Sequence, residues 1–312
     1  DAAVFLGRAG HEAGYVDQGA DRDVEGVAEP HEARALLGGV DVETAGHISG
    51  VVGHDAHGLS VQAVRAGAAR PLRLGAVLNH TPVHPATGSE EDKLAAQRAD
   101  AILNRSMLDP IFKASFPPEL LDLIALRLPP TFEDDLKVAA QPLEFLGINY
   151  YTRAVIRNEP GIPFVEFSEV RPSGSPYSMM WEIYPPGISE IITRIWNDYH
   201  PAQIIVSENG MPLSDDLDLD GQVRDPRRIQ YLQDHLVQVH RAIQDGVPVA
   251  GYLVWSLIDN FEWHFGYRMR YGLAHVDFAT QRRTIKSSGH WFKQVISQNG
   301  FTPRLHYLES PA

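Results

Sequence analysis

A short apolar run that ends in a glutamate most constrains the fold of this chain. Residues 204–206 are Ile-Ile-Val, and three consecutive β-branched residues are typical of a buried strand in a parallel sheet. Glu208 follows at the carboxyl end of this strand, and Asn209-Gly210 predicts a turn directly after it. Parallel sheets and barrels keep their chemistry at this end, so Glu208 is a candidate catalytic residue. A surface acid at a strand end is the alternative for a single glutamate.

A second apolar strand, over residues 252–258, runs into a cluster of tryptophans and acids. Trp255 lies within the strand, and Glu262 and Trp263 follow it. Core packing would explain either tryptophan alone. Two tryptophans that flank carboxylates and an amide at a strand end are more typical of a sugar-binding site, because they combine apolar faces with hydrogen-bonding groups.

Strands and helices alternate along the rest of the chain. Strands are predicted over residues 72–78 and 145–151, and helices over residues 89–107, 118–128, 187–199, 225–246 and 286–298. The alternation predicts an α/β fold whose parallel sheet has its helices outside. Residues 157–180, rich in Pro, Gly, Ser and Met, are predicted to form a long loop over the sheet end. No repeat or linker divides the sequence, so we expect one domain over residues 1–312.

Composition excludes several classes of partner. A formal charge of −13 argues against nucleic acid, which requires a basic face. No apolar run approaches ~20 residues, so we expect no membrane span. The chain contains no cysteine, which excludes disulfides and thiolate chemistry and fits a reducing compartment. Its start shows no basic-then-apolar leader, so we expect a cytoplasmic protein.

Metal-binding and cofactor-binding patterns are weak. Two His-Glu pairs begin like a zinc-binding helix motif, but both lack the second histidine that the motif requires. His54 and His57 could share a metal on one helix face, although surface or core histidines are commoner. The sequence has neither a glycine-rich phosphate loop nor a nucleophile elbow. We therefore expect no metal and no cofactor.

Four motifs occur in the order found in glycoside hydrolase family 1, the β-glucosidase family. They lie at residues 147–152, 181–185, 206–210 and 255–277, and residues 57–304 resemble the family almost continuously. The resemblance implies a (β/α)8 TIM barrel, of which this chain supplies roughly strands four to eight as one catalytic domain. The first three strands have no counterpart here. We expect either an upstream segment that completes the barrel or a fragment.

The resemblance also implies roles for individual residues. Glu208 takes the place of the nucleophile, which attacks the anomeric carbon and forms a glycosyl-enzyme. Tyr151 matches the tyrosine that donates a hydrogen bond to the nucleophile, and Asn149 lines the same floor. Trp255 matches the platform under the sugar ring. Trp181 suits a wall of the aglycone site, with packing at a helix start as the alternative.

Specificity follows from the pair Glu262 and Trp263, which match the residues that hold the outer hydroxyls of the sugar. Family members that hydrolyse phosphorylated sugars carry a smaller residue where Glu262 stands, because a carboxylate would repel the phosphate. Glu262 therefore implies a neutral glycone: a β-glucoside, a β-galactoside or a β-fucoside.

The acid/base residue has two candidates, because the family places it in an Asn-Glu-Pro motif after strand four. Asn158-Glu159-Pro160 has the right letters but lies in the predicted loop, only 49 residues (208 − 159) before Glu208. Glu29 lies 179 residues (208 − 29) upstream, one strand before residues 72–78, and is the assignment we prefer. Ala28 stands where the family has an asparagine that contacts the 2-hydroxyl.

The function expected from these residues is a retaining β-glycosidase that acts on a small β-glycoside or oligosaccharide. Ala28 and the divergent residues 1–56 leave two alternatives open. One is a carbohydrate-binding relative that keeps Trp255, Glu262 and Trp263 without catalysis. The other is an inactive barrel fragment.

Overall fold

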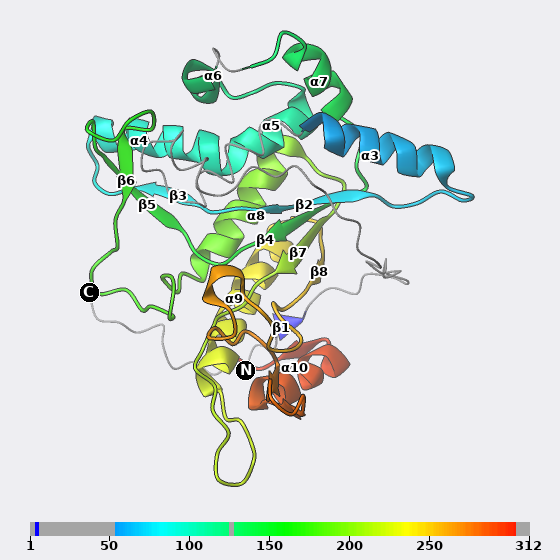
Figure 1. The fold of residues 1–312 in the computed structure, drawn as a ribbon, viewed down its shortest axis with the longest axis vertical. Coiled ribbons are helices and arrows are strands. Elements are labelled where there is room, and N and C mark those ends of the chain that lie inside the picture. Colours follow the sequence, from blue (N-terminus) through cyan, green and yellow to red (C-terminus); the bar gives the residue numbers. More distant parts are fainter. Residues whose placement is uncertain (1–3, 6–53, 125–127, 304–312) are drawn as a thin grey trace.

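The computed structural model describes residues 4–5, 54–124 and 128–303 (Figure 1). Its centre is a parallel sheet of four strands in the order β2-β4-β7-β8. The strands are β2 (Gly75–Asn79), β4 (Phe145–Asn149), β7 (Ile204–Glu208) and β8 (Val249–Tyr252). The prediction of one parallel sheet is confirmed, although β8 begins and ends earlier than residues 252–258. The segment that carries Glu29 lies outside the described residues.

The register of the sheet aligns three polar residues at the carboxyl ends of three adjacent strands, β2, β4 and β7. Asn79 at the end of β2 pairs with Asn149 of β4, and Asn149 pairs in turn with Glu208 of β7. An irregularity between Ile148 and Asn149 sets this last pairing. Bulges are common beside active sites because they change where a side chain points.

The main core lies between the sheet and three helices. These helices are α5 (Ser106–Lys113), α8 (Pro186–Tyr199) and α9 (Pro226–Gln244). Alternate sheet residues such as Ile148 and Val206 pack against them and are fully buried. Each such side chain contributes roughly 2 kcal/mol of transfer free energy. The strands are thereby fixed from one face, so their carboxyl ends keep a constant spacing.

The remaining helices of the described residues lie towards the two ends of the molecule, most of them near α5 and the last at the opposite end (Figure 1). They are α3 (His54–Gly67), α4 (Glu90–Asp100), α6 (Pro118–Ile124), α7 (Phe132–Ala139) and α10 (Ser287–Gln298). Ser89 caps α4, because its hydroxyl accepts a 3.2 Å hydrogen bond from the amide of Asp92. The helix predicted over residues 89–107 instead continues from α4 through a π-helical turn, η1 (Ala101–Arg105), into α5.

Residues 157–180 were predicted as a loop, and this prediction is wrong in part. β5 (Ala154–Asn158) pairs with β3 (Val83–Pro85) and, antiparallel, with β6 (Phe167–Glu169). Phe167 packs on the apolar face of α4, which stabilises a strand in a segment of poor strand propensity. The shorter elements are β1 (Val4–Phe5) with β11 (Gly300–Phe301), β9 (Ala274–Val276) with β10 (Arg283–Ile285), and the 3₁₀ turn η3 (Trp263–Phe265).

Candidate active site

Glu208 ends β7 and is held by a residue from the segment that follows the neighbouring strand, β4. The hydroxyl of Tyr151 donates a 2.6 Å hydrogen bond to Oε2 of Glu208. Asn149, in the same segment as Tyr151, accepts a 2.8 Å hydrogen bond from the hydroxyl of Ser207. The sequence placed these three residues, Glu208, Tyr151 and Asn149, on one floor, and the structure brings them together.

Burial and hydrogen bonding act in opposite directions on Glu208. Burial raises the pKa of the carboxyl above its ordinary value, while hydrogen bonds from Tyr151 and Asn149 work to lower it. Burial and the adjacent Glu208 charge raise the pKa of Tyr151, so its hydroxyl stays protonated and remains a donor. The site thus holds a half-buried carboxylate whose charge is stabilised by a neutral phenol.

The turn after Glu208 is fixed by one backbone carbonyl and two side chains from other parts of the chain. Asn209 is fully buried, and its amide donates to the carbonyl of Tyr150 at 2.8 Å and to the hydroxyl of Tyr231 at 3.0 Å. Its Oδ1 accepts a 2.5 Å hydrogen bond from Tyr252. A Cβ on Gly210 would stand 1.8 Å from the carbonyl oxygen of Trp255, so only glycine permits this approach of the two strand ends.

Trp255 and Glu262 form the second part of the site. The indole of Trp255 donates a 3.2 Å hydrogen bond to Oε1 of Glu262, whose exposed fraction is only 8%. Burial and the charges of Glu208 and Asp259 raise the pKa of Glu262. Trp263 behaves differently, since 81% of it is exposed. The structure therefore joins Trp255 and Glu262 and leaves Trp263 at the surface.

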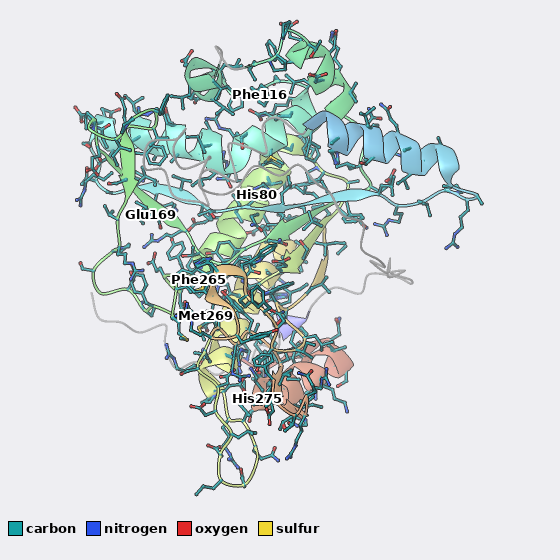
Figure 2. The ribbon with its side chains drawn as sticks, viewed as in Figure 1. His80, Phe116, Glu169, Phe265, Met269 and His275 are labelled. Carbon is teal, nitrogen blue, oxygen red and sulfur yellow. The ribbon has the colours of Figure 1, made fainter. Side chains whose placement is uncertain are left out.

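A pocket of about 370 Å³ opens beside Tyr151 and Asn149. Trp181 lines this pocket, with its ring 5.8 Å from the ring of Tyr151. The helix α8 begins five residues later, at Pro186, so Trp181 is not a packing residue of its first turn. This position fits a wall of the site. His80, labelled in Figure 2, lines the pocket from the segment that follows β2.

Of the two candidates for the acid/base residue, only Glu159 lies among the described residues. Glu29 and Ala28 lie outside the described residues. Glu159 is exposed in the turn between β5 and β6, where its amide donates a 2.9 Å hydrogen bond to the carbonyl of Glu166. Glu159 therefore does not line the pocket beside Tyr151.

Sequence reasoning missed several groups beside the site. Arg153 forms a bidentate pair with Glu182, with both N–O distances 2.8 Å, and stacks on Tyr184 at 3.9 Å from the ring centroid. Tyr271 is buried with its ring 6.2 Å from that of Tyr151. Only the position of Tyr271 inside a quoted motif could have singled it out. The arginine pair carries no local pattern.

Two absences apply to the part of the chain that the structure describes. Within residues 54–124 and 128–303, no group of three His, Asp or Glu side chains is arranged to hold a metal. Among the same residues, no helix has the length and apolar character needed to cross a bilayer.

The fold and site define a class of protein: part of a β/α barrel with a carboxylate at the strand mouth and a tryptophan–carboxylate pair beside it. The family model for Glycosyl hydrolase family 1 matches residues 43–301. The chain belongs to this family.

Individual relatives agree with this assignment. The chain is 40% identical over 248 residues to a 1,4-β-D-glucan glucohydrolase of Thermotoga neapolitana, covering 79% of this chain and 55% of that protein. It is 36% identical over 246 residues to 6-phospho-β-glucosidase GmuD of Bacillus subtilis, covering 73% and 53%. A solved β-glucosidase from Thermotoga maritima in complex with deoxynojirimycin matches with a TM-score of 0.79 at 34% identity, over 85% of this chain and 60% of that one. The chain thus spans about half the length of the curated relatives.

Proposed function

We propose that the protein is a retaining β-glycosidase that hydrolyses terminal, non-phosphorylated β-D-glucosides, with β-galactosides or β-fucosides as further substrates. The observation that carries the proposal is the Glu208 carboxylate at the mouth of β7, held by Tyr151 at 2.6 Å. Two of the relatives named above, a 1,4-β-D-glucan glucohydrolase and a β-glucosidase in complex with deoxynojirimycin, support a glucoside substrate. A third relative is a 6-phospho-β-glucosidase, so the proposed preference for non-phosphorylated sugars rests on Glu262.

The proposed reaction has two displacements. Glu208 attacks the anomeric carbon while Glu29 donates its proton to the leaving oxygen, which breaks the glycosidic bond and forms a glycosyl-enzyme. Glu29, now a carboxylate, removes a proton from a water that attacks the same carbon. Glu208 leaves as the carboxylate, and the β configuration is retained. The exposed position of Glu159 in a hairpin turn supports Glu29 as the acid/base.

We assign the glycone to the neighbourhood of Trp255 and Glu262. The Trp255 ring supplies an apolar face for the sugar, and the Glu262 carboxylate accepts hydrogen bonds from outer hydroxyls. Glu262 is almost buried, so its charge would strongly repel a 6-phosphate. We assign Trp263, whose side chain is exposed in this structure, to the same binding of the outer hydroxyls when the bound sugar covers it. Trp181 and the pocket beside Tyr151 suit the aglycone.

We further propose that residues 1–312 form one catalytic domain and that upstream polypeptide completes its barrel. In support, β2 and β8 each have one strand neighbour within the described sheet, and the chain covers just over half of its relatives. The absence of cysteine supports a cytoplasmic location.

Trapping the covalent intermediate tests the assignment. A 2-deoxy-2-fluoro β-glucoside with a good leaving group should add the mass of its sugar to the peptide containing residues 204–210. Glu208→Gln should abolish both labelling and hydrolysis, while Glu159→Gln, a matched change at an exposed glutamate, should leave both intact. A label on another carboxylate would refute the nucleophile. Binding of glucose without labelling or turnover would favour a carbohydrate-binding protein instead.

A further inference from the structure

Buried ion pairs join the two loops that carry the site. Three carboxylates and three cations contact one another behind it: Asp215, Asp225, Asp259, Arg228, Arg270 and Lys286. Asp215 follows β7 and Asp259 follows β8, whereas Lys286 precedes α10. Glu262 lies three residues after Asp259. The network therefore connects the segment after Glu208 with the segment that carries Glu262.

Asp259 anchors the loop that follows β8. Its Oδ1 accepts hydrogen bonds from the ammonium of Lys286 at 2.8 Å and from the amide of Gly272 at 2.9 Å. Its Oδ2 accepts from Arg270 at 2.7 Å and from the amide of Val276 at 3.3 Å. A Cβ on Gly272 would stand 2.2 Å from the Asp259 amide nitrogen, so glycine permits this close packing. The side chain of Asp259 has no exposed surface, and four donors hold it in one position.

Lys286 links Asp259 to the other loop. Its ammonium lies 2.8 Å from Asp259 and 2.5 Å from Asp215, and its side chain is fully buried. Arg228 reaches the same oxygen of Asp215 at 2.7 Å from the start of α9. Lys286 thus joins the loops after β7 and β8 through their side chains, in addition to the backbone hydrogen bonds from Trp255 to Asn209 and from Leu213 to Arg270.

Stability alone is a weak explanation for this lysine. Burial lowers the pKa of Lys286, which reflects the cost of removing an ammonium from water. Replacing a buried ion pair by apolar residues of similar volume is often neutral or stabilising. A buried cation between two catalytic-site loops is better explained by the geometry that it fixes.

We propose that Lys286 is a positioning residue. Through Asp259 it holds loop 256–263 so that Glu262 keeps its contact with Trp255 and meets the outer hydroxyls of the glycone. The inference rests on the proposed function, because it assumes that Glu262 binds the sugar. It predicts that losing Lys286 weakens recognition of those hydroxyls specifically, rather than weakening all substrates equally.

The test compares two substrates in the full-length protein. An aryl β-glucoside carries the outer hydroxymethyl group, and the corresponding β-xyloside lacks it. We expect Lys286→Met and the isosteric Asp259→Asn to lower kcat/KM for the glucoside roughly tenfold more than for the xyloside, mainly through KM. Asp109→Asn is the matched control, since it removes a nearly buried carboxylate charge, paired with Lys113 and Tyr199, that contacts neither this network nor loop 256–263. It should reduce thermal stability but leave the glucoside-to-xyloside ratio near that of the wild type.

One result would overturn the proposal, and two further situations call for a second variant or a second measurement. Equal losses for both substrates, with a lower melting temperature, would show a purely structural role and overturn the proposal. If Lys286→Met does not fold, the ratio measured with Asp259→Asn decides alone. If the wild type hydrolyses neither substrate, the proposed function fails, and tryptophan fluorescence titrations with glucose and xylose take the place of kinetics. Equal weakening of both sugars by the variants would then reject the positioning role.

Discussion

Tyr151, two residues beyond the end of β4, and Glu208, the last residue of the adjacent parallel strand β7, meet through a 2.6 Å hydrogen bond from the phenol to Oε2 of the carboxylate. A donor at this position stabilises the charged form of Glu208, whereas burial stabilises the neutral form. This opposition determines the pH at which the carboxylate becomes available for attack.

Tyr151→Phe should move the acidic limb of the pH profile of kcat/KM to higher pH. Without the phenol, only the Asn149 hydrogen bond opposes burial, so the pKa of Glu208 rises further and a higher pH is needed to ionise it. Loss of a hydrogen bond to a charged group should also lower kcat/KM by roughly 10- to 100-fold. Tyr177→Phe removes a hydroxyl from the same pocket that has no partner among the described residues, and should leave the limb in place. An unmoved limb in Tyr151→Phe would contradict this account.

Glu262 should select against phosphorylated sugars. The wild type is expected to prefer a plain aryl β-glucoside to its 6-phospho form, because the nearly buried carboxylate repels the phosphate. Glu262→Ser should lower kcat/KM for the plain glucoside by about 10- to 100-fold and narrow or reverse the preference. Glu133→Ser, at an exposed position of α7, serves as the control. A wild-type preference for the phosphorylated substrate would refute the role given to Glu262.

Glu29 should be needed most when the leaving group is poor. Glu29→Ala removes the proton donor, so alkyl glucosides should lose far more activity, on the order of 100-fold or more, than activated aryl glucosides. Azide should restore turnover and yield the β-glycosyl azide. Kinetics with a series of aryl leaving groups, beside Glu159→Ala as the control, measure the effect. Retention also requires the carboxyls of Glu29 and Glu208 to lie ~5–5.5 Å apart, and a separation of ~6.5–9.5 Å would predict inversion.

His235 should make folding stability depend on pH. It is fully buried in α9, its Nδ1 lies 2.7 Å from the carbonyl of Tyr231, and burial lowers its pKa from 6.5 to about 4. Between pH 4 and pH 6.5 the unfolded chain binds a proton at His235 that the folded chain does not bind, so the free energy of unfolding rises with pH. As the pH falls from 6.5 towards 4, the free energy of unfolding should decrease by roughly 3 kcal/mol in total.

Urea denaturation at several pH values measures this dependence. Carboxylates contribute to the same pH range, so the informative quantity is the difference between the wild type and His235→Gln, which cannot titrate. A smaller slope in the variant is expected. An identical slope in both proteins would show that His235 does not contribute.

Much of the fold could be predicted from the sequence because its signals are local. The β-branched run before Glu208 and the apolar run before Asn149 specify buried parallel strands, and both occur where expected. The Ser89 cap and the apolar stripe of α9 are local as well. The loop prediction for residues 157–180 was wrong at β6, because this strand is stabilised by packing of Phe167 on α4, a contact that local propensity does not contain.

The candidate site likewise combines features that the sequence predicts with features that depend on tertiary folding. The sequence by itself determined the residue types, the order of the motifs and the placement of Glu208 at a strand mouth followed by a turn. Only the tertiary structure decided which side chains meet, because strands distant in sequence become neighbours in the sheet. It joined Trp255 to Glu262 and left Trp263 exposed, whereas the hydrogen bond between Tyr151 and Glu208 was already implied by the family resemblance. The buried contact of Lys286 with Asp259 has no sequence signature, since ion pairs form across 27 residues of chain only after folding.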